Sequence, residues 1–113
     1  MKIKKFDVWI ANMNPVHGTE VGKSRPVVIF QTDLLNNNHP STIVLPITTN
    51  VKENLEILRV NLNEEETNLN RSSDVLIDQI RSIDNSRLKK KIGTISNQKA
   101  EQINQAVKIL LDF

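Results

Sequence analysis

The position of the helical pattern is the strongest constraint on what this chain can fold into. Apolar residues at α-helical spacing occur only near the C-terminal end of the sequence. The residues of this stripe are Ala100, Ile103, Val107 and Leu110, widened by Ile109 and Leu111. Ser96 is the expected N-cap of the helix. The rest of the chain has no such period, and we expect it to form β-structure.

Six stretches before this helix have the composition of β-strands. They span residues 6–11, 27–30, 42–48, 56–62, 74–83 and 91–95. Pro26 fits only at a strand start, and Pro46 indicates an edge, a bulge or a bend within 42–48. The connections leave little room for crossover helices, which favours antiparallel pairing. The sequence therefore predicts a mainly β, α+β fold: a small antiparallel barrel or strongly curved sheet with a C-terminal helix.

Composition bounds the kind of protein. The chain has 113 residues, of which 38% are hydrophobic and 25% charged, and we expect residues 1–113 to form one domain. It has no cysteine, which excludes disulfides, thiolate nucleophiles and cysteine-based metal centres. With only His17 and His39 as imidazoles, we expect no metal and no cofactor. No apolar run approaches the roughly 20 residues of a membrane helix, so we expect a cytoplasmic protein.

Charge is compatible with a nucleic-acid partner. The formal net charge is +2 and the pI is about 9.0, and basic segments flank an acidic stretch at 51–70. The chain has no tyrosine and few other aromatic residues, which argues against a platform of stacked bases. We expect Trp9 to lie in the core, and we expect the lysines at 89–91 to be a solvated turn.

Three stretches together carry a family resemblance. The first, within residues 7–28, reads D-V-W-I at 7–10, N-P at 14–15 and G-T-E-V-G-K-S-R-P-V-V at 18–28. The second, within 42–49, reads I-V-L-P-I-T-T at 43–49, and the third, within 75–93, begins V-L-I-D-Q-I-R-S-I-D at 75–84. With Arg87-Leu88 and Lys91-Ile92-Gly93, these stretches resemble the MazF/PemK (Kid-like) toxin endoribonucleases of type II toxin–antitoxin systems. The sequence departs from the family pattern at Phe6, where Gly is usual, and at Val21, where Gln is frequent. Thr19 stands where some members of the family have a histidine.

The resemblance implies a fold, an activity and partners. The fold would be an SH3-like barrel with a C-terminal helix, acting as a homodimer. The activity would be sequence-specific, metal-independent cleavage of single-stranded RNA, leaving a 2′,3′-cyclic phosphate and a 5′-hydroxyl. An antitoxin with an acidic, partly disordered tail would neutralise the protein.

The resemblance also implies that Arg25 and Thr48 are catalytic, and their chemistry can be examined. Cleavage through the RNA 2′-hydroxyl needs a proton acceptor, a proton donor and positive charge for the phosphorane. The Arg25 guanidinium suits the last role, since deprotonating arginine at neutral pH costs about 7 kcal/mol. Thr48 can donate a hydrogen bond but is not a strong base. Glu20, His17 and Asp78 are the alternatives for the acceptor, and we leave His17 out of the catalytic set because a lone loop histidine is usually just exposed.

Four more residues are candidates for binding the substrate: Glu20, Lys23, Asp78 and Gln79. We expect Lys23 to add positive charge on the same extended face as Arg25. Carboxylate and amide groups at 78–79 can read the edges of unstacked bases. Each carboxylate has a structural alternative, because Glu20 could be a turn partner and Asp78 could pair with Arg81 across a sheet.

Two other functions remain open at this point. CcdB-type toxins share the barrel and poison DNA gyrase without needing the Arg25 and Thr48 pair. A non-cleaving module of SH3-like fold would bind RNA or protein only.

Overall fold

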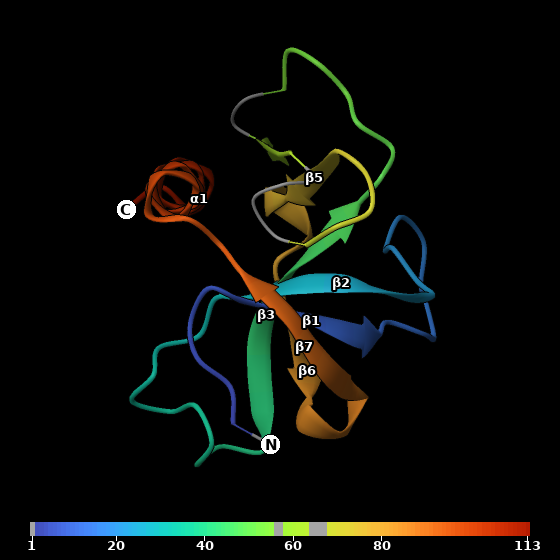
Figure 1. The fold of residues 1–113 in the computed structure, drawn as a ribbon, viewed down its shortest axis with the longest axis vertical. Helices are drawn as coiled ribbons and strands as arrows, with labels where there is room; N and C mark the ends of the chain where they lie inside the picture. Colours follow the sequence, from blue (N-terminus) through green and yellow to red (C-terminus); the bar gives the residue numbers. More distant parts are fainter. Residues whose placement is uncertain (1, 56–57, 64–67) are drawn as a thin grey trace.

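A mainly antiparallel β-sheet and one C-terminal helix make up the described parts of the computed structural model, residues 2–55, 58–63 and 68–113. The strand order is β4-β5-β3-β2-β1-β7, with β6 pairing with β3 outside this path (Figure 1). The strands are β1 Asp7–Asn12, β2 Ser24–Ile29, β3 Ser41–Thr48, β4 Arg59–Leu62, β5 Ser73–Leu76, β6 Arg81–Asp84 and β7 Leu88–Thr94. Short 3-10 turns η1 and η2 span Ile77–Gln79 and Asn85–Arg87, and helix α1 spans Asn97–Leu111. This confirms the predicted fold class.

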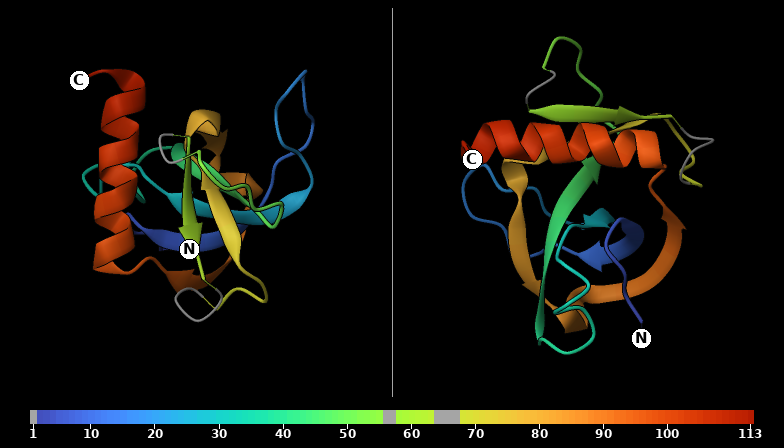
Figure 2. Two further views of the ribbon diagram at one scale, coloured as in Figure 1. Left: turned by 90° about the horizontal axis from the view of Figure 1, so that it is seen from above. Right: turned by 90° about the vertical axis from the view of Figure 1, so that its left-hand side faces the viewer.

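The sheet has a packed cluster on each face because side chains alternate along a strand. In β1, Val8 belongs to the cluster shared with α1, whereas Trp9 and Ala11 belong to the cluster enclosed by the curved strands. Figure 2 shows α1 lying along one side of this curved sheet. Trp9 is 6% exposed, which confirms its predicted place in the core.

Helix α1 begins as predicted. The side chain of Ser96 accepts a hydrogen bond from Lys99 N at 3.2 Å and caps the first turn. Ile103 is fully buried, but Ile109 and Leu111 are 56% and 53% exposed, so the expected widening of the buried stripe is wrong. The sheet covers only one narrow side of the helix. None of the helices in the described ranges combines the length and apolar character needed to cross a membrane.

Both strand prolines lie where a missing N–H is tolerated. Strand β3 runs through Pro46 as one element, and its pairing partner changes from β6 to β5 around this residue. Pro46 falls between the part of β3 that pairs with β6, residues 41–44, and the part that pairs with β5, residues 47–48. Pro26 is the third residue of β2, not its start. Strand β2 gains β3 as its second neighbour only from Val27.

The stretch 74–83 is not the single long strand that its composition predicts. Val75 lies opposite Ile47 of β3, and Arg81 lies opposite Val44. From Val75 to Arg81 the chain advances by six positions, whereas the facing part of β3, from Ile47 to Val44, covers only three positions. Residues without a partner on β3 form the 3-10 turn η1. Strand β7 also starts earlier than expected. The first residues of the predicted strand at 56–62 lie outside the described residues.

Candidate active site

Arg25 and Thr48 come together at one end of the β2–β3 pair. Val27 lies opposite Pro46 where the pairing of β2 with β3 begins, and the Arg25 side chain reaches the carbonyl oxygen of Ile47, the residue before Thr48. Alternation along β2 puts Arg25 on the same face as Val27, which belongs to the cluster enclosed by the curved strands. The two residues thus lie where β2 begins and β3 ends, at the rim of that enclosed space.

The Arg25 side chain is held by two backbone carbonyls. Its Nε donates to the carbonyl oxygen of Gly22 at 2.7 Å, and its Nη1 donates to that of Ile47 at 3.3 Å. Desolvation by burial lowers the pKa of the half-buried Arg25 guanidinium, which still remains charged at neutral pH. A guanidinium has five N–H donors, so others are left for a phosphate.

The Thr48 hydroxyl is oriented by the chain that follows it. Its Oγ1 accepts a hydrogen bond from Asn50 N at 3.2 Å. A hydroxyl that accepts one hydrogen bond can still donate its own proton. Thr48 is half-buried. The side chain can therefore reach solvent and donate to a phosphate oxygen placed beside Arg25.

The loop that precedes Arg25 is packed against itself. A Cβ on Gly22 would lie 2.5 Å from Val16 Cγ1 and 2.6 Å from Asn14 Oδ1. That Asn14 oxygen also accepts from Lys23 N at 2.9 Å. An added Cβ would displace the Val16 and Asn14 side chains, and the Asn14 oxygen is the one that holds Lys23 N next to the carbonyl that binds Arg25.

Two predicted substrate-binding residues have structural roles in this loop. Glu20 is exposed, and its Oε1 accepts from His17 N at 2.9 Å, so the turn-partner alternative is what the structure shows. Lys23 is exposed with a φ of 67° and lies outside β2. The expectation that Lys23 and Arg25 share an extended face is therefore wrong, because the extended strand starts only at Ser24.

Asp78 and Gln79 lie in η1, next to the same loop. Gln79 Nε2 donates to the carbonyl oxygen of Thr19 at 3.5 Å, which joins the two segments. Asp78 is exposed. Among the described residues no ion pair links it to Arg81, whose Nη1 is buried without a hydrogen-bond partner there. The geometry thus brings η1 and the loop at 14–23 together near Arg25.

Sequence reasoning missed Asp74 and Arg59. Asp74 lies opposite Thr48 on β5, is 1% exposed, and forms an ion pair with Arg59 at 3.0 Å. A charged residue at the head of the apolar run 75–77 was the available signal. The described ranges contain no group of three or more histidine, aspartate or glutamate side chains that could hold a metal ion.

Comparison with known proteins decides the family. The profile of the PemK-like, MazF-like toxins of type II toxin–antitoxin systems matches residues 4–111. The chain belongs to this family. A relative from Staphylococcus saprophyticus, named Endoribonuclease MazF, is 36% identical over 109 residues, which are 96% of this chain and 91% of the relative.

Solved structures of family members share the fold. A crystal structure of MazF from Deinococcus radiodurans superposes with a TM-score of 0.86 at 22% identity, covering 100% of this chain and 99% of the other. A MazE–MazF structure from the same organism gives a TM-score of 0.80 at 21% identity, covering 100% and 99%. At these identities the likeness concerns the fold alone.

Proposed function

We propose that the protein is an endoribonuclease toxin that cleaves single-stranded RNA, mRNA in particular, and thereby stops translation and growth. The observation that carries this proposal is the Arg25 guanidinium, which the carbonyl oxygens of Gly22 and of Ile47, the residue before Thr48, hold in place. Membership of the MazF-like family and a 36% identical relative named as an endoribonuclease support it. The proposed site of action is the cytoplasm, where mRNA is translated.

The proposed reaction is a transesterification without a metal ion. The 2′-hydroxyl oxygen attacks the adjacent phosphorus while the bond to the 5′-oxygen breaks, giving a 2′,3′-cyclic phosphate and a 5′-hydroxyl. Arg25 donates to the phosphorane oxygens, on which negative charge builds up. Thr48 donates a further hydrogen bond to the same group. Both donors are in place before the substrate arrives, which lowers the cost of reorganisation.

Neither of these two residues accepts the 2′-hydroxyl proton, so the acceptor is a third group. Glu20, His17 and Asp78 are the titratable candidates in the loop and turn beside Arg25. Single replacement of each by its amide, or of His17 by Asn, tests this assignment. The true acceptor is the residue whose replacement removes the acidic limb of the pH–rate profile.

The same surface supports sequence-specific binding. Asp78 and Gln79 present a carboxylate and an amide that can pair with base edges, and Glu20 and Lys23 lie in the loop that precedes Arg25. These four residues are our proposed substrate-binding set. Replacing Asp78 or Gln79 by Ala is expected to change the preferred sequence around the cut more than the cleavage rate at a permissive site.

Primer extension on a long natural RNA treated in EDTA tests the proposed activity. Wild-type protein should give discrete cuts that share a short sequence, and Arg25→Ala and Thr48→Val should each slow them. For Arg25→Ala we expect a loss of about 10²–10³ in rate. Lys108→Ala is the control for loss of one positive charge, because α1 lies across the molecule from the start of β2 (Figure 1).

Intact RNA after treatment with demonstrably folded wild-type protein would contradict the proposal. Inhibition of DNA gyrase would then favour the CcdB-like alternative. Binding of RNA without cleavage would favour the non-cleaving module.

A protein antitoxin is the second proposed partner. Structures of MazE–MazF from Deinococcus radiodurans show that a relative forms such a complex. We propose that an acidic, partly disordered tail folds onto the basic surface around Arg25 and blocks RNA. Simultaneous binding of antitoxin and RNA without competition would contradict this occlusion.

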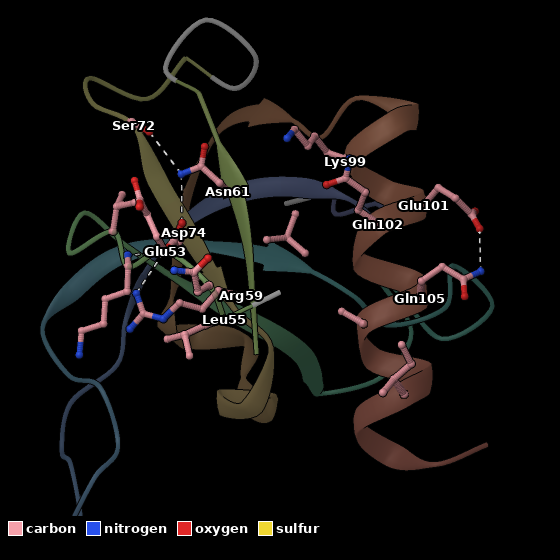
Figure 3. A pocket seen from close by; sticks show the side chains of 16 residues that line it. Glu53, Leu55, Arg59, Asn61, Ser72, Asp74, Lys99, Glu101, Gln102 and Gln105 are labelled. Carbon is pink, nitrogen blue, oxygen red and sulfur yellow. Dashed lines mark hydrogen bonds and ion pairs between the residues drawn. The ribbon is translucent and has the colours of Figure 1, made fainter. Parts of the chain in front are cut away.

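The third proposed partner is a second copy of this chain. A groove of about 900 Å³ lies between α1 and the residues 51–55, and Ile109, Val51 and Leu55 are exposed along it. Figure 3 shows Lys99 and Glu101 on the helix side of the groove and Glu53 on the opposite side. Charges of both signs beside apolar side chains suit an interface of two identical surfaces.

A further inference from the structure

Asp74 is a buried carboxylate beside the proposed active site that the mechanism above does not use. It lies in the middle of β5, opposite Thr48 of β3 on one side and opposite Asn61 of β4 on the other. Its exposure is 1%. A buried charge destabilises the fold unless it is paired and hydrogen-bonded, so the partners of Asp74 indicate what it holds in place.

Three donors satisfy the Asp74 carboxylate. Oδ2 accepts from Lys52 N and from Arg59 Nη1, both at 3.0 Å, and Oδ1 accepts from Asn61 Nδ2 at 3.0 Å. Figure 3 shows Arg59 and Asn61 meeting Asp74 on the wall of the groove opposite α1. Desolvation by burial raises the pKa of Asp74. The hydrogen bonds from Lys52, Asn61 and Arg59, together with the charge of Arg59, lower this pKa by more, so it lies below its usual value. The carboxylate is therefore ionised at neutral pH.

These bonds fix the chain that follows Thr48. Arg59 Nη1 donates to the carbonyl oxygen of Asn50 at 2.6 Å as well as to Asp74. Asn50 N in turn donates to Thr48 Oγ1, the bond that orients the hydroxyl. Lys52 N, two residues further on, is bound directly by Asp74. Asp74 thus holds the segment from Thr48 to Lys52 at two points: directly at Lys52 N, and through Arg59 at the carbonyl of Asn50.

We propose that Asp74 is a positioning residue for RNA cleavage: with Arg59 it holds residues 48–52 so that the Thr48 hydroxyl faces the phosphate beside Arg25. This inference rests on the proposed ribonuclease function. The positioning depends on one oxygen, which accepts from both Lys52 N and Arg59, while the other oxygen accepts from Asn61. The same bonds set the path of the loop that follows Thr48.

The test compares Asp74→Val, Asp74→Asn and Arg59→Met with the wild type on an RNA oligonucleotide that the wild type cuts. Asp74→Val removes both acceptor oxygens and with them all three hydrogen bonds, and we expect kcat to fall by about 10- to 100-fold while KM stays within about twofold. Arg59→Met should change kcat in the same direction. Asp74→Asn keeps an oxygen for Lys52 N, and its kcat should remain within about threefold of the wild type.

Amide hydrogen exchange provides a readout that does not depend on activity. Exchange at Asn50 and Lys52 should be faster in Asp74→Val than in the wild type. Lys52 N loses its hydrogen-bond acceptor, and Arg59 loses the ion pair that holds it at the carbonyl of Asn50. Arg59→Met should also accelerate exchange at Asn50. Because the Arg59 side chain is 16% exposed, this variant is used for the test if Asp74→Val does not fold. Wild-type exchange rates at both amides in these variants would overturn the proposal.

Asp7→Val is the matched control. Asp7 is also a buried strand aspartate, 2% exposed and ion-paired with Lys91, but it lies on β1 and contacts neither Thr48 nor the segment after it. Its kcat should equal that of the wild type. An equal loss of kcat in Asp7→Val would overturn a specific role for Asp74. If the wild type cuts no RNA, the proposed function fails, and exchange at Lys52 still decides whether Asp74 holds the segment.

Discussion

Arg25 combines two tasks that need the shape of a guanidinium. Its Nε and Nη1 are bound by the carbonyl oxygens of Gly22 and Ile47, which fixes the plane of the group. The remaining N–H donors then have a defined direction toward a phosphate. A lysine has a single ammonium group and no such fork, so it cannot be held by two carbonyls and still present donors in a plane.

We therefore expect Arg25→Lys to lose nearly as much activity as Arg25→Ala, about 10²–10³ in cleavage rate, although the positive charge is retained. Single-turnover cleavage of an RNA oligonucleotide measures this loss. A rate for Arg25→Lys within a few fold of the wild type would show that charge alone is needed.

The carboxylate of Asp74 predicts a pH dependence of stability. Its folded-state pKa lies below the usual value of about 3.9, because the hydrogen bonds and the charge of Arg59 outweigh desolvation. The ionised group thus stabilises the fold above about pH 4, and this contribution is lost as pH falls through the folded pKa. The free energy of unfolding should be larger for the wild type than for Asp74→Asn at pH 7, and this difference should shrink toward pH 3.

Denaturant unfolding of both proteins at several pH values measures this difference. Asp7→Asn serves as a second buried aspartate for comparison. A difference between wild type and Asp74→Asn that stays constant down to pH 3 would contradict a depressed pKa.

Single residues were predictable only where a motif marked them. Arg25 and Thr48 could be named because residues 18–27 and 43–49 carry the family resemblance, and the pairing of β2 with β3 brings them to the same end of the two strands. Asp74 could not be assigned, because its partners Lys52 and Arg59 come from a loop and strand whose pairing the sequence does not reveal.

At the scale of elements, the site depends on irregular segments supported by regular ones. Strand β3 pairs with β2, β5 and β6, and this gives it a fixed end at Thr48. The strands were largely predictable from their apolar runs. Turn η1 could not be predicted, because the composition of residues 74–83 is that of a continuous strand. Only the register with β3 shows that the residues of η1 have no partner on that strand.

The loop at 14–23 yields a prediction for Gly22. Adding a methyl group in Gly22→Ala forces the Asn14 oxygen away from Lys23 N, which loosens the backbone beside the carbonyl that binds Arg25 Nε. A displacement of this kind at a catalytic group is expected to lower the cleavage rate by about 10- to 100-fold. Cleavage of the same oligonucleotide under single-turnover conditions measures it.

Gly18→Asn is the control for Gly22→Ala. Gly18 has a φ of 58° and nothing within 4 Å of an added Cβ, and asparagine tolerates this backbone conformation. The control should cut at a rate close to that of the wild type. Equal rates for Gly22→Ala and the wild type would show that the position of the Gly22 carbonyl does not matter.

At the scale of the whole molecule, apolar surface remains uncovered on one side. Ile109 and Leu111 are more than half exposed on α1, and Phe113 is 75% exposed. The sequence predicted a wider buried stripe on the helix, because periodicity does not show how much of the helix surface the sheet covers. Of these residues, Ile109 lines the groove beside α1.

We predict that Ile109→Arg converts a dimer into a monomer. A charged side chain would be buried in the proposed interface of two copies, whereas in one copy it would simply be solvated. Sedimentation at micromolar concentration should give about twice 12.9 kDa for the wild type and 12.9 kDa for the variant. A wild type that sediments as a strict monomer would contradict the dimer.

The most direct test of the central claim uses one RNA oligonucleotide that contains the preferred cut sequence, and the same oligonucleotide with a 2′-deoxy nucleotide at the cut. Both are treated with the protein in EDTA. The account predicts cleavage of the all-RNA substrate, with a 2′,3′-cyclic phosphate end, and no cleavage of the deoxy-substituted one. Cleavage of both substrates, or of neither, would contradict a metal-independent reaction in which the RNA supplies its own nucleophile beside Arg25 and Thr48.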